Sequence, residues 1–248
     1  MGTIFSSDRY DIRFNDIDYK ERLLITSIVE YLGDIAIKHS ESLGNGLKYL
    51  KEHKLGWVIY KWDIDVLRYP SYGEKLTVRT WAYSFRKFYA YRQYDILNAD
   101  GQVVCRANSI WFLIDTDKRK PMRISDEMYE TYGIGKEDTT PLNFEKLQLP
   151  GRVDSQKEFS VRYSDIDSNR HVNNSKYIGW SIETIPLEIV EKYTLTNLKV
   201  NYEKETKYGD NVNIITEIQH ENDKIICRHE VKDGEGNKTT LLQTEWSL

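Results

Sequence analysis

A run of acidic, amide and imidazole side chains stands before a predicted helix in the second half of the chain. Residues 165–174 read DIDSNRHVNN, in which Asp167, Asn169 and His171 alternate. The N-terminus of a helix carries free N–H groups and about half a positive charge, so it can hold an oxyanion. An imidazole has an ordinary pKa of about 6.5 and can act as a base, while an amide can orient water or a carbonyl. This pattern is typical of a hydrolytic site.

Each of these residues also has an ordinary structural explanation. Asn173 or Asn174 could cap the helix that follows by accepting hydrogen bonds from its free N–H groups. A single His171 is more often a satisfied surface histidine than a catalyst. Glu205, in the segment NYEKETKYGD, lies among charged residues and could belong to a solvated strand edge. The functional interpretation therefore depends on the whole set and on whether the fold alone requires it.

The two halves of the chain share a sequence pattern, so comparing them tests whether the fold alone requires these residues. Residues 10–22 align with residues 159–171 without a gap, at an offset of 149 residues (159 − 10 = 149). Further along the chain, residues 72–78 align with residues 208–214 at an offset of 136 (208 − 72 = 136), and Trp111 aligns with Trp246 at an offset of 135 (246 − 111 = 135). The order of landmarks is the same in both halves, so we infer a duplication. The second half is shortened in or just after its helical segment.

Residues that the shared fold requires should occur in both copies, whereas residues required for chemistry can survive in one. Asp167 matches Asp18, so this aspartate alone could be structural. The proton-handling and hydrogen-bonding groups differ between the copies. The pairs, with the second half first, are Asn169 and Lys20, His171 and Arg22, Asn173 and Leu24, Asn174 and Ile25, and Glu205 and Tyr69. The candidate site therefore belongs to the second half alone.

Each half is predicted to contain a short extended segment, then an amphipathic helix, then several strands. Apolar residues from Leu24 to Ala36 recur at helical spacing, and a second apolar helix is expected from Tyr177 to Ile185, where Pro186 interrupts it. The later segments are rich in Val, Ile, Tyr and Trp, and the turns NADGQ and KDGEGN predict hairpins. The fold class is α+β, with two curled antiparallel sheets, each wrapped around a central helix.

The expected domains are a first half over residues 1–122, a linker over residues 123–157 and a second half over residues 158–248. The linker is polar and contains Pro141, Pro150 and Gly151. Within it, SDEMYETYG predicts a short helix with Ser125 as N-cap and Gly133 after its end.

Composition excludes several classes of function. A formal charge of −4 argues against a nucleic-acid partner, and no run of about 18 apolar residues could span a membrane. The two cysteines, Cys105 and Cys227, have no metal-site spacing, so we expect neither a zinc site nor a disulfide framework. Both are expected to be small core residues, which favours activated water as the nucleophile. With no secretion signal at the N-terminus, the expected location is the cytoplasm.

The segment DIDSNRHVNNSKYIGW resembles the second-half motif of the acyl-acyl-carrier-protein thioesterases, the plant plastid enzymes and their bacterial relatives. The segments GWVIYKWDIDVLRYP and VNYEKETKYGDNV extend the resemblance over nearly the whole chain. It implies a tandem, or double, hot-dog fold and catalytic roles for Asp167, Asn169, His171 and Glu205. We also expect Asn173 and Asn174, at the helix N-terminus, to bind substrate. Because the plant enzymes have a cysteine where this chain has Thr206, the resemblance supports activated water.

The resemblance implies hydrolysis of a fatty acyl-acyl-carrier-protein thioester, which would release free fatty acid without a cofactor or metal. The partner would be an acyl carrier protein with a phosphopantetheine-linked acyl chain, and a homodimer is compatible with this interpretation. The first half would hold the acyl chain. The absence of a plant transit peptide favours a bacterial cytoplasmic enzyme.

Two alternatives remain open: an acyl-CoA thioesterase of the same fold, and a non-catalytic acyl-binding protein. A looser form of the motif occurs in single hot-dog acyl-CoA thioesterases. A carrier-docking patch is left unassigned, because a solvated loop is the better explanation of its candidates. These candidates are Lys118, Arg119, Lys120 and Arg123.

Overall fold

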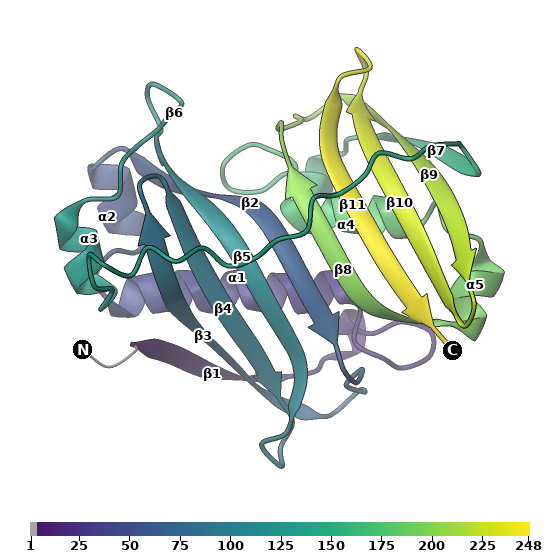
Figure 1. Ribbon diagram of the computed structural model, residues 1–248, viewed down its shortest axis with the longest axis horizontal. Helices are drawn as coiled ribbons and strands as arrows, with labels where there is room; N and C mark the ends of the chain where they lie inside the picture. The colour runs from purple at the N-terminus through teal and green to yellow at the C-terminus, as the bar shows by residue number, and fades with distance from the viewer. Residues whose placement is uncertain (1–3) are drawn as a thin grey trace. The chain divides into compact units, whose positions relative to one another are not determined.

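The computed structural model describes residues 4–248 and divides the chain into two compact units between Phe144 and Glu145 (Figure 1). Each unit is an antiparallel sheet with a helix against one face. The α+β class and the two helix-bearing sheets expected from the sequence are therefore confirmed. In the described residues, no helix combines the length and the apolar character that crossing a membrane requires.

The first unit has a five-stranded sheet in the order β1-β3-β4-β5-β2, with the short β6 paired to β5. Its central helix is α1, whose Ile28 and Leu32 are fully buried, as the apolar spacing predicts, and Ile35 is fully buried as well. The elements are β1 (Phe5–Asp11), η1 (Phe14–Asp16), α1 (Ile25–Ser42), α2 (Leu47–Glu52), β2 (Leu55–Val66), β3 (Lys75–Arg86), β4 (Tyr89–Leu97), β5 (Val103–Asp115), β6 (Lys120–Pro121) and α3 (Asp126–Thr131).

The second unit repeats this plan with the strand order β8-β11-β10-β9-β7. Its central helix, α4, has Tyr177, Ile178 and Trp180 buried in the core. The elements are β7 (Ser155–Ser160), η2 (Tyr163–Asp165), α4 (Asn174–Ile182), α5 (Leu187–Lys192), β8 (Thr194–Tyr202), β9 (Asn211–Glu221), β10 (Lys224–Asp233) and β11 (Lys238–Ser247).

The strand register confirms the internal repeat. Tyr10 on β1 pairs with Leu76 on β3, and Phe159 on β7 pairs with Val212 on β9. These two pairs reproduce both offsets (159 − 10 = 149; 212 − 76 = 136). The central helix has 18 residues in the first unit and 9 in the second, so the shortening falls at the helix, as predicted.

Most local predictions agree with the structure, and the exceptions have local causes. Gly101 and Gly236 have φ values of 78° and 85° in the two predicted turns. The β3–β4 turn was not predicted, because Lys87 adopts a left-handed φ of 57° in a stretch without glycine or asparagine. The short helices α2 and α5 were also missed, since each has only six residues and too few turns for a periodic signal.

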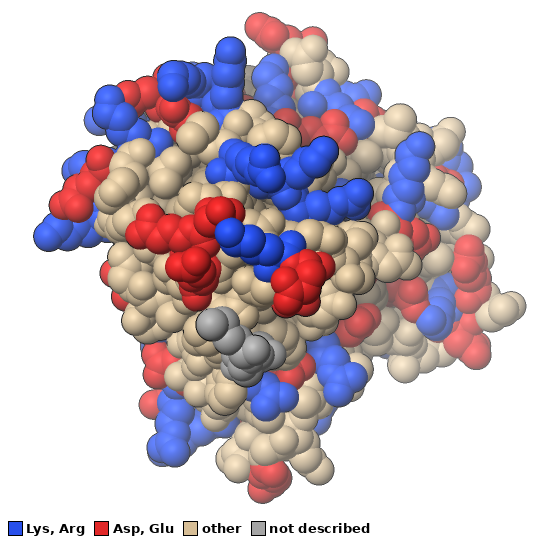
Figure 2. All heavy atoms as spheres, turned by 60° about the vertical axis from the view of Figure 1, so that its left-hand side comes forward, with Lys and Arg blue, Asp and Glu red and all other residues tan. Residues whose placement is uncertain are grey.

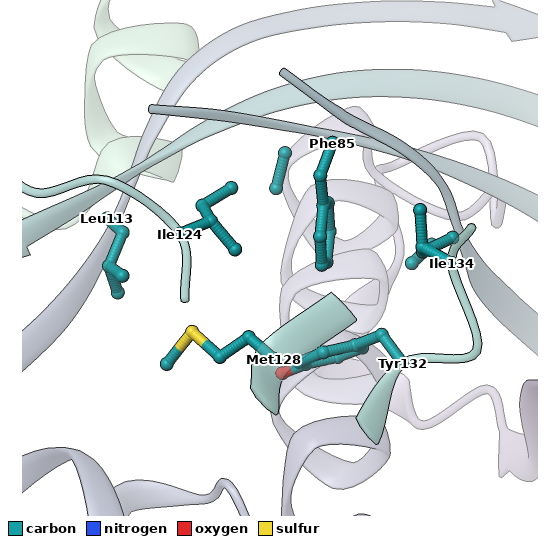
Figure 3. Packing of buried hydrophobic residues seen from close by; sticks show 8 residues of the cluster. Phe85, Leu113, Ile124, Met128, Tyr132 and Ile134 are labelled. Atoms are coloured by element: carbon teal, nitrogen blue, oxygen red, sulfur yellow. The ribbon is translucent and has the colours of Figure 1, made fainter. Parts of the chain in front are cut away.

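The first part of the predicted linker packs into the first unit. The side chain of Ser125 accepts a hydrogen bond from the Met128 N–H and caps α3, as expected. Met128 and Tyr132 are buried in an apolar cluster against Phe85 of β3 (Figure 3). The structural division between Phe144 and Glu145 therefore lies within the predicted linker of residues 123–157, and α3 belongs to the core of the first unit.

A buried polar network crosses the core of the second unit. His229 on β10 is fully buried, and its Nδ1 lies 2.8 Å from Thr216 Oγ1, while its Nε2 lies 3.3 Å from Thr244 Oγ1. Burial lowers the pKa of His229 to about 3, because no solvent stabilises the charged ring. The network therefore favours the neutral imidazole at physiological pH.

This burial predicts acid sensitivity. The unfolded chain protonates His229 near its ordinary pKa of about 6.5, whereas the folded chain does not until about pH 3. The contribution of the neutral ring to stability is therefore complete above about pH 6.5 and is lost as the pH falls toward 3, by up to about 1.4 kcal/mol per pH unit. Urea unfolding between pH 7 and 5 should show a shallower pH dependence for His229→Gln than for the unaltered protein. Equal slopes would contradict this account.

Candidate active site

The loop before α4 is built around the Asp167 carboxylate. Asp167 Oδ1 accepts hydrogen bonds from the backbone N–H groups of Asn169 at 2.8 Å and His171 at 3.2 Å. The backbone N–H of Asp167 donates to the carbonyl of His171 at 2.8 Å. Arg170 takes a left-handed φ of 65°, which lets the chain reverse between Asn169 and His171. The loop thus fixes the backbone that carries the amide and the imidazole.

The same frame occurs in the first unit with different side chains. Asp18 Oδ1 accepts from the N–H groups of Lys20 at 2.8 Å and Arg22 at 2.9 Å, and Glu21 has a φ of 59°. The backbone geometry of the loop is therefore a property of the shared fold. This agrees with the sequence interpretation that the aspartate by itself can be structural.

The structure brings His171 and Glu205 together. His171 Nε2 lies 3.1 Å from Glu205 Oε2, and the two side chains are 21% and 36% exposed. At the matching positions of the first unit, the Arg22 guanidinium lies over the Tyr69 ring, 5.3 Å from its centre. The repeat offsets therefore identified pairs that are in contact in both units. A carboxylate in contact with a partly exposed imidazole can accept a proton from water.

Asn169 and the two asparagines of the helix start have different surroundings. Asn169 is exposed on the loop, where its Nδ2 lies 3.4 Å from Asp167 Oδ2. Asn173 is the N-cap of α4, and its Oδ1 accepts from the Ser175 N–H at 3.0 Å and from the Ser175 hydroxyl. Asn174 is the first helical residue, and its carbonyl accepts from the Tyr202 hydroxyl at 3.0 Å. The capping explanation thus accounts for the Asn173 oxygen, while substrate binding by Asn173 and Asn174 stays a prediction.

Neither cysteine is placed for nucleophilic catalysis. Cys105 and Cys227 are free and buried on strands, as expected for small core residues. Burial raises the pKa of Cys227 to about 12 and also raises that of Cys105, so both thiols stay protonated. Thr206, directly after Glu205, is 1% exposed, and its hydroxyl is hydrogen-bonded to Tyr177.

Sequence reasoning missed the contribution of Tyr177 and Tyr202 to this region. Tyr177 was interpreted only as an apolar core residue of the helix, yet its hydroxyl meets Thr206 at 2.7 Å. Tyr202 donates to the first turn of α4. A signal was present in the repeat, because the positions that match Tyr177 and Tyr202 are Ile28 and Val66 (177 − 149 = 28; 202 − 136 = 66).

The candidate docking cations are partly engaged in local contacts. Lys118 Nζ lies 3.2 Å from the Asp115 carboxylate, and Lys120 is in β6, which pairs with β5. Figure 2 brings forward the side of the first unit that carries α2 and α3, and it shows Lys and Arg side chains there beside groups of Asp and Glu. Charge on this face is therefore mixed rather than uniformly positive.

Comparison with known proteins gives consistent matches along the chain. Residues 3–132 match the family described as "Acyl-ACP thioesterase N-terminal domain", and residues 150–248 match "Acyl-ACP thioesterase C-terminal domain". The chloroplastic palmitoyl-acyl carrier protein thioesterase of Gossypium hirsutum is 27% identical over 99% of this chain. The chloroplastic oleoyl-acyl carrier protein thioesterase of Coriandrum sativum is 26% identical over 89% of it. The chain spans 64% of the length of each of these two relatives.

Solved structures share the fold. A Lactobacillus plantarum protein described as an oleoyl thioesterase superposes with a TM-score of 0.89 at 26% identity, covering 99% of this chain and 96% of its own. The 12:0-ACP thioesterase of Umbellularia californica gives a TM-score of 0.85 at 21% identity, covering 98% of this chain and 93% of its own. The tandem hot-dog fold expected from the resemblance is thereby confirmed.

Proposed function

Because the chain belongs to the acyl-ACP thioesterase family, we propose that it hydrolyses the thioester of a fatty acyl-acyl carrier protein and releases free fatty acid. The observation that carries this proposal is the contact of His171 Nε2 with Glu205 Oε2 at 3.1 Å, beside the start of α4. The matching residues of the first unit are an arginine and a phenol, which cannot serve as a general base at neutral pH.

The proposed reaction uses water as the nucleophile. Glu205, assisted by His171, accepts a proton as water attacks the thioester carbonyl, and the carbonyl oxygen becomes an oxyanion. The positive N-terminal end of the α4 dipole stabilises that charge, and Asn169 orients the water or the carbonyl. The C–S bond then breaks, and the pantetheine sulfur leaves as a thiol after taking up the proton. Asp167 holds the loop that carries Asn169 and His171.

The two units have different proposed roles. The second unit carries the chemistry, and the first, which has an arginine and a tyrosine in place of the histidine and glutamate, holds the acyl chain. The division is supported by the first-unit pair itself, in which the Arg22 guanidinium lies over the Tyr69 ring. We also place the protein in the cytoplasm, where its two free, buried thiols would remain reduced.

Assays with matched acyl chains on the two carriers test the function. Purified protein is mixed with acyl-acyl carrier protein or acyl-CoA over a series of chain lengths, and release of free fatty acid is measured. A higher kcat/KM on the protein carrier supports the proposal. A higher kcat/KM on CoA would instead identify an acyl-CoA thioesterase, and binding without hydrolysis would identify an acyl-binding protein.

Docking of an acidic carrier protein predicts a dependence on salt. Exposed charges that attract each other over several ångströms are screened at high ionic strength, where the Debye length falls from about 10 Å at 0.1 M to about 3 Å at 1 M. We expect kcat/KM on acyl-acyl carrier protein to fall more steeply between 0.05 and 0.5 M NaCl than kcat/KM on acyl-CoA. Parallel curves for the two substrates would argue against electrostatic docking.

A further inference from the structure

The residue that follows Glu205 is anchored by three hydrogen bonds. The Tyr177 hydroxyl lies 2.7 Å from Thr206 Oγ1, and it also accepts from the Thr206 backbone N–H at 3.1 Å. The Val172 N–H donates to the Thr206 carbonyl at 3.0 Å. Tyr177 and Thr206 are only 2% and 1% exposed. Water therefore competes little for these groups, and the contacts hold the segment in one place.

This anchor lies next to both members of the candidate catalytic pair. Thr206 follows Glu205 directly, and Val172 follows His171 directly. Glu205 itself stands between β8 and β9, in a stretch without strand pairing, so the ladder does not fix it. Upstream, the N–H groups of Glu203 and Lys204 donate to the Thr239 carbonyl. The backbone downstream of Glu205 is therefore held through Thr206.

The first unit shows which of these bonds the fold requires. Thr206 matches Pro70, and Tyr177 matches Ile28 (206 − 136 = 70; 177 − 149 = 28). The backbone bond is kept, because the Leu23 N–H donates to the Pro70 carbonyl at 2.8 Å. Isoleucine has no hydroxyl and proline has no N–H, so the two bonds to the tyrosine hydroxyl are absent there. The tyrosine–threonine contact therefore accompanies the His171–Glu205 pair and is not needed for the hot-dog fold.

We propose that Tyr177 and Thr206 are positioning residues that hold the Glu205 carboxylate against His171. The inference rests on the proposed thioesterase function and deepens it. The hydroxyl of Thr206 acts as a tether and not as a nucleophile, since it is buried and hydrogen-bonded. A small displacement of a catalytic base is enough to reduce turnover strongly, because proton transfer requires close and aligned groups.

Single substitutions test the tether. Tyr177→Phe and Thr206→Val each remove one hydroxyl with little change of shape, and each should lower kcat about 10- to 100-fold while KM changes less than about twofold. Thr206→Ser keeps the hydroxyl and should retain most of the activity. Thr244→Val is the matched control, because Thr244 is fully buried and bonds to His229 and Trp246 away from the pair. It should lower the melting temperature but leave kcat unchanged.

A double-mutant cycle separates positioning from general loss of structure. If Tyr177 acts through Glu205, then Tyr177→Phe should have little further effect on the residual kcat of Glu205→Gln. If Tyr177→Phe lowered kcat by the same factor in the unaltered protein and in Glu205→Gln, the inference would be overturned. Wild-type kcat in both Tyr177→Phe and Thr206→Val, with Glu205→Gln strongly impaired, would overturn the inference and leave the proposed function intact. Wild-type kcat in Glu205→Gln would overturn the inference and the role of Glu205 as base, whereas no hydrolysis of any acyl thioester by the unaltered protein would overturn the proposed function.

Discussion

Replacing Glu205 by glutamine, or His171 by alanine, is expected to lower kcat by at least about 100-fold, the usual scale for losing a general base. Glutamine keeps the shape of the side chain but cannot accept the proton from water. Alanine removes the imidazole that lies 3.1 Å from the carboxylate. The measurement is release of the carrier thiol from an acyl-acyl carrier protein at saturating substrate.

The first unit supplies a control at the matching position. Arg22 occupies the place of His171 on a loop with the same backbone hydrogen bonds. Arg22→Ala should leave kcat within about threefold of the original value, since a guanidinium stays protonated at neutral pH and cannot act as the general base. Wild-type rates in both the Glu205 and the His171 variants would show that the pair does not perform the chemistry.

The second large effect concerns the aspartates that frame the two loops. Asp167→Ala and Asp18→Ala each remove a carboxylate that accepts two backbone N–H bonds. Hydrogen bonds to a charged group contribute about 1.5–3 kcal/mol, so both variants should lose a similar free energy of unfolding. Only Asp167→Ala should also lose turnover, by about tenfold or more, because its loop carries Asn169 and His171.

Urea unfolding and steady-state kinetics on the same preparations make this comparison. If the two variants lose the same free energy of unfolding but only Asp167→Ala loses turnover, the aspartates serve the fold of both loops. The side chains on the second-unit loop then serve the reaction. An equal fall of kcat in the Asp18 variant would mean that the first-unit loop also contributes to the reaction.

Much of the fold was predictable because the two halves of the sequence can be compared with each other. The matched segments fixed the order of elements, and the pairs Tyr10–Leu76 and Phe159–Val212 confirm the register. What could not be predicted depends on tertiary packing. Lys87 turns the chain in a left-handed conformation that its residue type does not favour. The segment around Met128 is polar enough to resemble a linker, yet one face of α3 is buried.

The candidate site was predictable in part for the same reason. His171 was singled out because its match is Arg22, and Glu205 was supported by the resemblance and by its match with Tyr69. The contact between them is a long-range one that no local pattern specifies. Tyr177 escaped notice because a tyrosine at a core position of a helix is explained by its ring alone. Its hydroxyl acquires a role only when the segment with Thr206 folds against α4.

The shared loop frame also bears on redesign. Because the Oδ1 atoms of Asp18 and Asp167 accept hydrogen bonds from backbone N–H groups two and four residues ahead, the side chains at those positions can change without loss of the turn. The Asp18 loop of the first unit could therefore accept the polar side chains of the Asp167 loop by substitution. The same latitude let the side chains of the two loops diverge after the duplication, while the turn stayed the same.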